Sequence, residues 1–391
     1  MTDLLGNEIA DLVYSEYDRL STSSKPAVRS NGTKEWTILS GLVAVPLHPG
    51  PQLRLISLTT GVKATPNQDL ERSQGRVLHD CHAEILALRG FNYVLLRQMQ
   101  AARNNDRCDL ILPGIQDTNK FRLNPEYQLA LFISRLPCGD GSMNSLQEQG
   151  GLGQDTNGID DDDPVQYIDP NNRSLLRGRF NYAKKGCVRT KPGRMDSKIT
   201  YSKSCSDKLC CHQATSILNA CTWPLIEEAV YIDYLIVPNI SASDRNALER
   251  CFTTRLSSAT FPVHKMQILS CGQSFADDQQ DEDEQPSSIS CVKLYITEGE
   301  TLEQAVLSGI RNGFFTKVSK PLRNNCETAV SRLSQWRLFC TLNPEASNKY
   351  TSYRDFKSKL VPRAELITRT RSLLTNGQPW IPTCSDDFNT C

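Results

Sequence analysis

Apolar residues recur along the chain in runs that predict strands. Residues 36–47 and 53–61 are β-branched and apolar, and the turn residues between them, His48-Pro49-Gly50-Pro51, predict a hairpin. The near-continuous apolar run at 127–139 predicts a buried strand that ends at Pro-Cys-Gly. Further strands are expected at 230–238, 265–270 and 291–297.

Apolar residues at helical spacing predict helices between these strands. Residues 4–19 show this pattern, and a second helix is expected to begin near Asp80, with an apolar stripe of Leu88, Phe91, Leu95 and Met99. Further helices are expected at 204–225, at 243–256 and through the basic C-terminal tail. Alternating strands and helices predict an α/β fold with a single domain, a mixed central sheet flanked by helices, and a basic C-terminal helical part.

The expected domain organisation is simple. Residues 1–35 are interpreted as an N-terminal helix and linker, and residues 36–391 as the domain. Two segments rich in Gly, Gln and acidic residues, at about 147–164 and 274–288, are expected to be mobile insertions.

Composition excludes several classes of protein. Hydrophobic residues make up 39% and charged residues 23% of the 391 residues, which is typical of a globular protein. No apolar run approaches the roughly 18 to 20 residues of a membrane span, so no membrane partner is expected. The N-terminus lacks the basic and apolar regions of a secretory signal. The fifteen cysteines are therefore expected to be reduced thiols in the cytoplasm or nucleus, and the protein is not expected to be secreted.

Charge is unevenly distributed although 44 basic and 44 acidic residues cancel. Residues 177–203 carry nine Lys/Arg against one Asp, and residues 311–371 carry thirteen against four acids. Acidic stretches at 160–163 and 277–284 balance them. A solvated surface explains any single charge run, but two separate basic blocks favour a polarised molecule that meets an anionic partner.

His82-Ala83-Glu84, followed by Pro137-Cys138-Gly139, carries the clearest chemistry. A His-x-Glu and a distant Pro-Cys form the core of the zinc nucleoside-deaminase signature, in which His and Cys hold zinc and Glu moves protons. Either motif alone occurs by chance. Here one is expected to open a helix and the other to close a buried strand, and together they favour a deaminase site.

The third zinc ligand is not given by this signature, because Gly141 stands where the second Cys is usual. Cys81 adjoins His82 but is expected to point away from it. Cys210-Cys211-His212 lies inside an apolar helix, where such residues are more often core. Cys205 precedes a predicted helix, as do His82 and Cys138, and we favour it.

With these residues identified, the chain resembles the adenosine-to-inosine RNA deaminase family, which is related to the ADAR catalytic domain. The resemblance is strongest to the branch that acts on tRNA. It spans about residues 36–381 and rests on Gly61-Val62-Lys63, HDCHAEILALRGF (79–91), SRLPCGDGS (134–142), RTKPGR (189–194), SCSDKL (204–209), Tyr353 and Lys357.

The resemblance implies a cytidine-deaminase-like domain with one catalytic zinc. It implies that His82, Cys138 and Cys205 bind the zinc and that Glu84 is the catalytic proton shuttle. The implied reaction is hydrolytic deamination of adenosine to inosine. The implied partner is the anticodon stem-loop of alanine tRNA, edited at the adenosine 3′ of the anticodon.

The resemblance also implies a buried, structural inositol hexakisphosphate. Family positions that contact its phosphates correspond to Arg89, Lys208, Tyr353, Lys357 and Trp380. Asp80 and Lys208 are implied to relay hydrogen bonds between this ligand and the zinc ligands.

The basic stretch beside Cys205 is expected to contact RNA phosphates, giving salt-dependent affinity. The residues expected to do so are Lys184, Lys185, Arg189, Lys191 and Arg194. Lys63, by its family position, is expected at the pocket rim. The target base must leave its stack, which an anticodon loop makes easier than a duplex does.

Three departures from the family pattern bear on the inositol phosphate contacts and the substrate fit. They are Leu88 in place of an arginine, Cys210-Cys211-His212-Gln213 in place of a basic-aromatic pair, and Met195-Asp196 in place of Gly-Asp. Two alternative functions remain open: an editase acting on double-stranded RNA, and a non-catalytic RNA-binding relative. The sequence does not give the oligomeric state and is compatible with a monomer.

Overall fold

Eight strands form the central sheet, in the order β13-β12-β8-β2-β3-β15-β16-β17. The computed structural model describes residues 2–48, 52–117, 119–148, 163–193, 197–317, 319–383 and 386–390. β12 pairs in parallel with both β8 and β13, and the other neighbours are antiparallel. The strands are β2 (Leu39–Pro46), β3 (Arg54–Thr60), β8 (Tyr127–Ile133), β12 (Tyr234–Pro238), β13 (Gln267–Cys271), β15 (Ile289–Thr297), β16 (Glu300–Leu307) and β17 (Ile310–Arg311).

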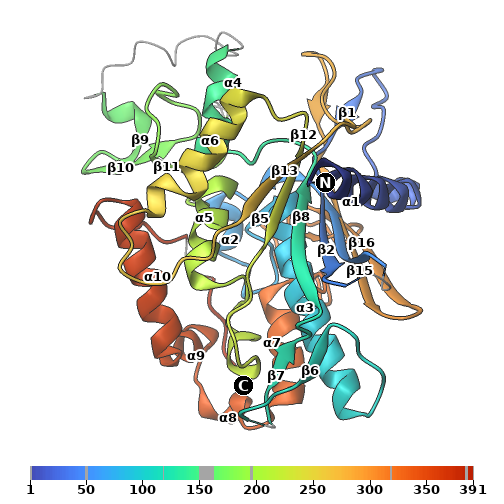
Figure 1. Ribbon diagram of the computed structural model, residues 1–391. Coiled ribbons are helices and arrows are strands. Elements are labelled where there is room, and N and C mark those ends of the chain that lie inside the picture. Colours follow the sequence, from blue (N-terminus) through green and yellow to red (C-terminus); the bar gives the residue numbers. More distant parts are fainter. Residues whose placement is uncertain are drawn as a thin grey trace.

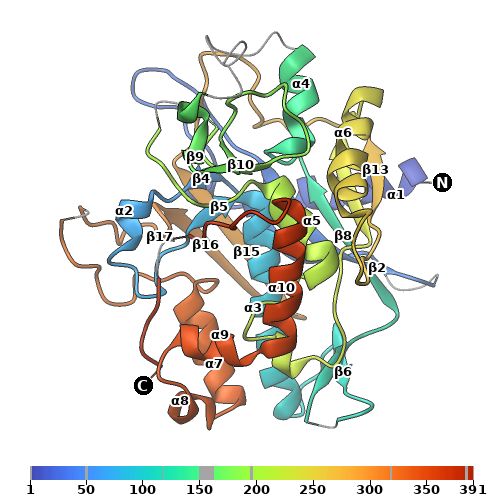
Figure 2. The same cartoon turned by 90° about the vertical axis from the view of Figure 1, so that its left-hand side faces the viewer.

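The sheet is covered on both faces, as Figures 1 and 2 show. Helix α1 (Thr2–Asp18) covers one face, where Leu39 and Val43 pack against it. Helix α3 (Ala83–Arg103) covers the other face, where Leu42 packs. Successive strand side chains point to opposite faces, which explains why β2 is apolar along almost its whole length.

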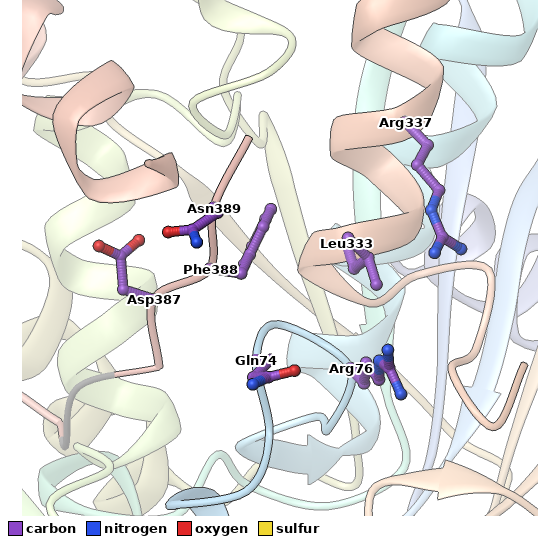
Figure 3. A pocket seen from close by; sticks show the side chains of 7 residues that line it. All are labelled: Gln74, Arg76, Leu333, Arg337, Asp387, Phe388 and Asn389. Atoms are coloured by element: carbon purple, nitrogen blue, oxygen red, sulfur yellow. The ribbon is translucent and has the colours of Figure 1, made fainter. Parts of the chain in front are cut away.

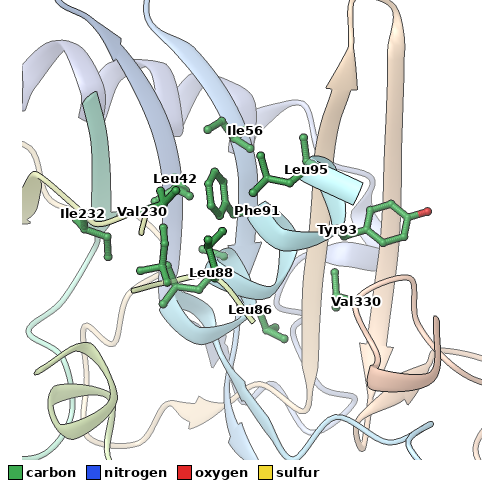
Figure 4. Close-up of a cluster of buried hydrophobic side chains, with 14 of the residues drawn as sticks. Leu42, Ile56, Leu86, Leu88, Phe91, Tyr93, Leu95, Val230, Ile232 and Val330 are labelled. Carbon is green, nitrogen blue, oxygen red and sulfur yellow. The ribbon is translucent and has the colours of Figure 1, made fainter. Parts of the chain in front are cut away.

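Helix α3 lies at the centre of the larger hydrophobic core. Its side chains Leu88, Phe91 and Leu95 meet Leu42 and Ile56 of the sheet (Figure 4). Gly90 is required by a close approach, because a Cβ there would lie 2.9 Å from the Cβ of Ser57 on β3. The apolar stripe therefore fixes α3 against the sheet and, with it, the position of the helix N-terminus.

The remaining elements surround this core. The other helices are α2 (Asn67–Leu70), α4 (Met143–Glu148), α5 (Cys205–Thr215), α6 (Ala242–Phe252), α7 (Arg332–Leu342), α8 (Ala346–Lys349), α9 (Tyr353–Lys359) and α10 (Val361–Leu374). Short strands pair as β1 (Glu35–Trp36) with β14 (Gln285–Pro286), β4 (Val62–Ala64) with β5 (Asp80–His82), β6 (Ile111–Pro113) with β7 (Phe121–Leu123), and β9 (Tyr167–Asp169) with β10 (Asn172–Arg177) and β11 (Val188–Thr190).

The mixed α/β fold expected from the sequence is confirmed, while several element boundaries differ. Residues 80–82 form a strand, and the helix begins at Ala83. The helix expected over 204–225 ends at Thr215, because Ser216 takes a left-handed conformation with φ of 66°. The basic C-terminal region is helical from Arg332 onward, but β16 and β17 precede those helices.

The two segments expected to be mobile insertions differ in how far they can be described. Residues 149–162 lie outside the described residues. In the segment 274–288, β14 pairs with β1, and Asp278 lies 2.9 Å from Arg135 in an ion pair. These contacts were not anticipated from the acidic composition.

Candidate metal centre and basic cavity

His82 is positioned where a strand becomes a helix. It ends β5, pairs with Val62 of β4, and is the N-cap residue of α3. Its backbone N–H donates to Oδ1 of Asp80 at 3.1 Å, which holds the turn. The packing of α3 against the sheet therefore fixes this imidazole.

Cys138 follows β8 and is delivered by a turn that only glycine fits. Gly139 has φ of 100°, and a Cβ there would lie 2.1 Å from Oγ of Ser204. This close approach brings the end of β8 against the start of α5. The backbone N–H of Cys205 donates to Sγ of Cys138 at 3.3 Å.

Cys205 is the first residue of α5, and the local sequence explains why the helix begins there. The Ser204 side chain caps the helix by accepting from the Asp207 N–H at 3.1 Å. The Asp207 carboxylate accepts from Arg255 at 2.7 Å. The unpaired N–H groups of a helix start favour negative charge, so this position stabilises a thiolate.

The three side chains converge as the sequence predicted. The ligand atoms of His82, Cys138 and Cys205 all lie within 4.8 Å of one another. Nδ1 of His82 is 3.8 Å from Sγ of Cys138. Tetrahedral zinc, with bonds of about 2.1 Å to nitrogen and 2.3 Å to sulfur, places such atoms about 3.6 Å apart. Three protein ligands of this kind fit zinc and leave one position open, which is the catalytic arrangement.

Glu84 lies in the first turn of α3, two residues after His82. Its side chain is buried, and its Oε2 atom has no hydrogen-bond partner within the described part of the chain. A buried carboxylate oxygen without a hydrogen bond to protein is free to accept one from water or substrate. Glu84 is not part of the ligand group. Its role as proton shuttle stays a prediction.

A buried ion-pair network supports the metal centre. Nζ of Lys191 donates to Sγ of Cys205 at 2.9 Å and to both carboxylate oxygens of Asp80, at 2.7 and 2.9 Å. Burial raises the pKa of Asp80, but Lys191 and Lys208 outweigh this and hold it well below its ordinary value. Burial lowers the pKa of Lys191, and the charges of Asp80 and Cys205 raise it well above its ordinary value.

Lys208 extends the network towards the C-terminal helices. Its ammonium donates to Asp80 and, at 2.8 Å, to Oγ of Ser202. Lys208 also lines a large basic cavity. Asp80, Lys191 and Lys208 thus connect the metal centre to that cavity. The relay role that the family resemblance implies for Asp80 and Lys208 stays a prediction.

The residues expected to contact RNA lie in different environments. Arg189 is fully buried and donates to four backbone carbonyl oxygens. Lys191 is buried in the network described above. Neither side chain therefore presents its charge to a phosphate, because the charged groups of both donate hydrogen bonds inside the protein.

Three other residues of this group are accessible. Lys63 is exposed on β4, whereas Lys184 and Lys185 are partly exposed. Nζ of Lys185 donates to the carbonyl of Met143 at 2.9 Å, and Lys184 lies over the ring of Tyr167. Arg194 lies outside the described residues.

The basic cavity has a volume of about 330 Å³, which is typical of small-ligand sites. It lies among α5, α9, α10, residues 380–383 and residues 386–387. Seven cations line it against two carboxylates: Lys203, Lys208, Arg332, Arg354, Lys357, Arg363 and Arg371 with Asp386 and Asp387. Asp386 is paired with Arg332 and His79, so the remaining positive charge is largely uncompensated.

Burial among cations lowers the pKa values of two lysines of the cavity. Burial, together with Lys208 and Arg371, lowers the pKa of Lys203 to about 7. Burial, together with Arg332, Arg363 and Arg371, lowers the pKa of Lys357 to about 8. Crowded cations of this kind fit a polyanionic ligand, because arginine and lysine donate strong hydrogen bonds to phosphate.

Four of the five residues implied to contact inositol hexakisphosphate line this cavity: Lys208, Tyr353, Lys357 and Trp380. Arg89 is not among the lining residues; its Nε donates to the carbonyl of Val330 at 3.0 Å. The ring of Trp380 contacts Lys203 and Arg371, at 5.2 and 5.1 Å from its centroid.

Sequence reasoning did not identify Lys203, Arg332, Arg363 and Arg371 as part of this cavity. One signal was present for two of them. Arg363, Ile367 and Arg371 are spaced four residues apart, which places them on one face of α10. For Lys203 and Arg332, no local pattern distinguishes a cavity cation from an exposed one.

The other cysteine candidates lie apart from the ligand group. Cys81 is buried, and burial raises the pKa of its thiol to about 12. Cys210 is fully buried in the hydrophobic core. Cys211 and His212 line the basic cavity, where Nδ1 of His212 donates to the carbonyl of Ser216 at 2.7 Å.

A second cavity, of about 340 Å³, lies between residues 74–76, α7 and residues 387–389 (Figure 3). Arg76 and Arg337 lie on one side of it, and Asp387 and Asn389 on the other. No residue expected to bind zinc, inositol phosphate or RNA lines it.

None of the helices in the described part of the chain has the length and apolar character that a membrane span requires.

Comparisons with known proteins agree with this geometry. The tRNA-specific adenosine deaminase 1 of Saccharomyces cerevisiae is 43% identical over 386 residues, covering 98% of this chain and 94% of that protein. The protein of the same name from Schizosaccharomyces pombe is 31% identical over 396 residues, covering 98% and 96%. The double-stranded RNA-specific editase B2 of Mus musculus is 26% identical over 212 residues, covering 52% and 27%. The adenosine-deaminase (editase) domain matches residues 57–373, and the chain belongs to this family.

Proposed function

We propose that this enzyme deaminates adenosine to inosine in tRNA by zinc-dependent hydrolysis. The convergence of His82, Cys138 and Cys205 beside the buried Glu84 is the observation that carries the proposal. The relatives that match nearly the whole chain are named as tRNA-specific adenosine deaminases, which supports tRNA as the substrate. The family resemblance supports the adenosine 3′ of the anticodon in alanine tRNA.

Zinc held by the three ligands would supply a Lewis acid that lowers the pKa of water from 15.7 to about 7. Glu84 takes a proton from the attacking water and gives it to the ring nitrogen next to the amine-bearing carbon. Glu84 then takes the remaining proton of the added hydroxyl group and gives it to the amine, which leaves as ammonia when its bond to the ring carbon breaks. The water oxygen remains on the ring as the carbonyl of inosine.

Burial and the neighbouring Cys138 sulfur raise the pKa of Cys205, and the ion-pair network acts in the opposite direction. The Lys191 ammonium lies 2.9 Å from this sulfur, and Asp80 fixes the ammonium in place. A cation beside a buried thiol favours its charged form, which is the form that binds zinc. Lys191 is therefore a positioning residue, replacing the phosphate-contacting role expected from its place in a basic stretch.

The basic cavity supports a structural inositol hexakisphosphate. Lys208, Tyr353, Lys357 and Trp380 would contact its phosphates, together with Lys203, Arg363 and Arg371. Such a ligand would neutralise cations that otherwise repel one another. The path from Lys208 through Asp80 and Lys191 to Cys205 would then couple its charge to the zinc ligands.

Accessible cations near the site support an RNA substrate. Lys63 lies on β4, opposite Cys81 of β5, the strand that ends at His82. Lys184 and Lys185 lie in the segment before β11. These three residues remain our proposed phosphate contacts near the metal centre. Arg194 stays an expectation from the sequence. The cytoplasm or nucleus remains our proposed location.

The test is incubation of the purified protein with total tRNA, followed by sequencing for adenosine-to-inosine conversion. Conversion at the position 3′ of the alanine anticodon is the expected result. A long RNA duplex tested in parallel distinguishes the double-stranded RNA editase, which would act on the duplex instead. RNA binding without deamination of either substrate would favour a non-catalytic relative.

A further inference from the structure

The segment that follows β17 combines positive charge with an exposed aromatic ring. Between residues 311 and 325 the chain carries Arg311, Lys317, Lys320 and Arg323 and no acidic residue. Phe315 is 48% exposed, and it is the sole aromatic among the large exposed apolar side chains of the described residues. Among the residues that the structure describes, neither Lys317 nor Lys320 forms an ion pair.

The backbone of this segment is anchored. The guanidinium of Arg72 donates to the carbonyl of Lys317 at 2.7 Å, and to the carbonyl and hydroxyl of Thr316, both at 2.9 Å. Phe314 and Leu322 pack against the buried cluster of Leu70, Val77, Ile310 and Cys326. The segment is thus built on a small core of its own while Phe315 remains exposed to solvent.

The segment is joined to the chain that forms the metal centre. The N–H of Leu78 donates to the carbonyl of Gly309 at 2.8 Å, just before β5 and His82. Arg72 belongs to the same connection between β4 and β5. Figure 2 shows α2 and β17 beside β4 and β5. The connection between β4 and β5 therefore joins this surface to Lys63 and to His82 of the metal centre.

We propose that Phe315, with Lys317, Lys320 and Arg323, forms a second RNA-binding surface that holds one unpaired nucleotide of the tRNA substrate. The base stacks on the ring of Phe315, and the cations contact the flanking phosphates. An exposed aromatic side chain among cations is the arrangement that binds single-stranded RNA. Any base can stack on the aromatic ring, and each phosphate of the backbone carries a negative charge that a cation can contact. This inference rests on the proposed function and adds a contact outside the deamination site.

Binding of a fluorescein-labelled alanine tRNA transcript, measured by anisotropy, tests the stacking contact. Phe315→Ala is expected to raise the Kd by about 5- to 150-fold, the range that loss of one stacked base gives. Phe315→Trp keeps a stacking face and is expected to stay within about twofold of wild type. Ile115→Ala removes another exposed apolar side chain, 73% exposed near β6, and is the matched control.

The phosphate contacts are tested by the salt dependence of the same Kd. Replacing Lys317 and Lys320 together by Gln is expected to lower the slope of log Kd against log salt by about 1.4, or about 0.7 per lost contact on a single strand. Lys265→Gln serves as the control, since it precedes β13, at the sheet edge opposite β17.

Deamination kinetics separate this inference from the proposed function. The Phe315 variant should raise KM while leaving kcat at saturating tRNA unchanged. If the wild-type enzyme deaminates tRNA but Phe315→Ala binds as tightly as wild type, the inference is overturned and the function stands. If wild-type protein deaminates no tRNA, the proposed function itself fails.

Discussion

At the scale of one residue, the proposed role of Glu84 predicts different effects of its substitution on zinc content and on turnover. Glu84→Gln keeps the shape of the side chain and removes its ability to take a proton. We expect zinc content to stay at wild-type level while turnover falls by about 10²- to 10⁴-fold or more, the range for loss of general acid–base catalysis. Metal analysis of the purified variant and an inosine assay on tRNA measure the two effects. Loss of zinc from the variant would make Glu84 a ligand instead.

The assignment of the third ligand gives a second prediction at this scale. Cys205→Ala is expected to lose zinc, because its sulfur lies in the group with His82 and Cys138. Cys210→Ala, five residues along the same helix, is expected to retain it, because Cys210 is packed in the core. Metal analysis of both variants checks this. Retained zinc in the Cys205 variant would redirect the third ligand to another residue.

Individual residues also show how far sequence reasoning reaches. His82, Glu84 and Cys138 were identifiable because motif and expected helix start coincide. Lys191 was assigned to RNA because a lysine in a basic stretch is usually exposed. Its burial depends on Asp80 being brought beside it from 111 residues away, which no local pattern records. Arg189 differs from expectation for another reason: its partners are nearby backbone carbonyls, such as those of Gly178 and Lys184, and a contact with backbone leaves no side-chain pattern in the sequence.

At the scale of elements, the turn at Gly139, which follows β8 and approaches the start of α5, decides whether the two cysteines can meet. Gly139→Ala would place a Cβ 2.1 Å from Oγ of Ser204 and force an alanine to adopt φ of 100°. Strain and overpacking together are expected to lower the free energy of unfolding by about 2–4 kcal/mol and to separate Cys138 from Cys205.

Zinc content and thermal unfolding of the Gly139 variant measure these effects. Gly272→Ala is the control, because its Cβ would meet no atom closer than 4.0 Å and should change neither quantity. Wild-type zinc and stability in Gly139→Ala would show that this turn does not set the distance between the ligands.

Elements with strong periodicity were predictable, and those defined by pairing were not. Helix α3 carries an apolar stripe at helical spacing, and β2, β3 and β8 are short apolar runs rich in residues that favour strands. The strand pair β4–β5 has three residues in each strand, too few to carry a period. Strand β16 contains several polar residues and is partly exposed. It is a strand because it pairs with β15, which its residue composition does not predict.

At the scale of the whole molecule, the net charge is zero, yet the wall of the basic cavity is strongly positive. The cavity cations come from Lys203 before α5, Arg332 on α7, Lys357 on α9, and Arg363 and Arg371 on α10. Only folding brings them together, so the residue pattern alone predicts a basic C-terminal region, and the buried anion site there is implied only by the family resemblance. Assembling these charges costs free energy that a bound polyanion would recover.

This coupling predicts how inositol hexakisphosphate should stabilise the protein at different pH values. In the free protein the pKa of Lys203 lies at about 7 and that of Lys357 at about 8, both below the value of about 10.4 for an unfolded lysine. Between pH 7 and 10 the unfolded chain therefore binds more protons than the folded one. The stability contribution of these lysines accordingly rises with pH in the absence of the ligand.

A bound polyanion reverses that behaviour, because its charge raises both lysine pKa values and binding takes up protons. The increase in Tm produced by added inositol hexakisphosphate is thus expected to be larger at pH 6.5 than at pH 9. Thermal unfolding with and without the ligand measures it, and Lys203→Met, which cannot take up a proton, should flatten the dependence. The ligand's own ionisation acts equally on both proteins and cancels in this comparison. A Tm increase with the same pH dependence in wild type and variant would show that Lys203 does not take up a proton when the ligand binds.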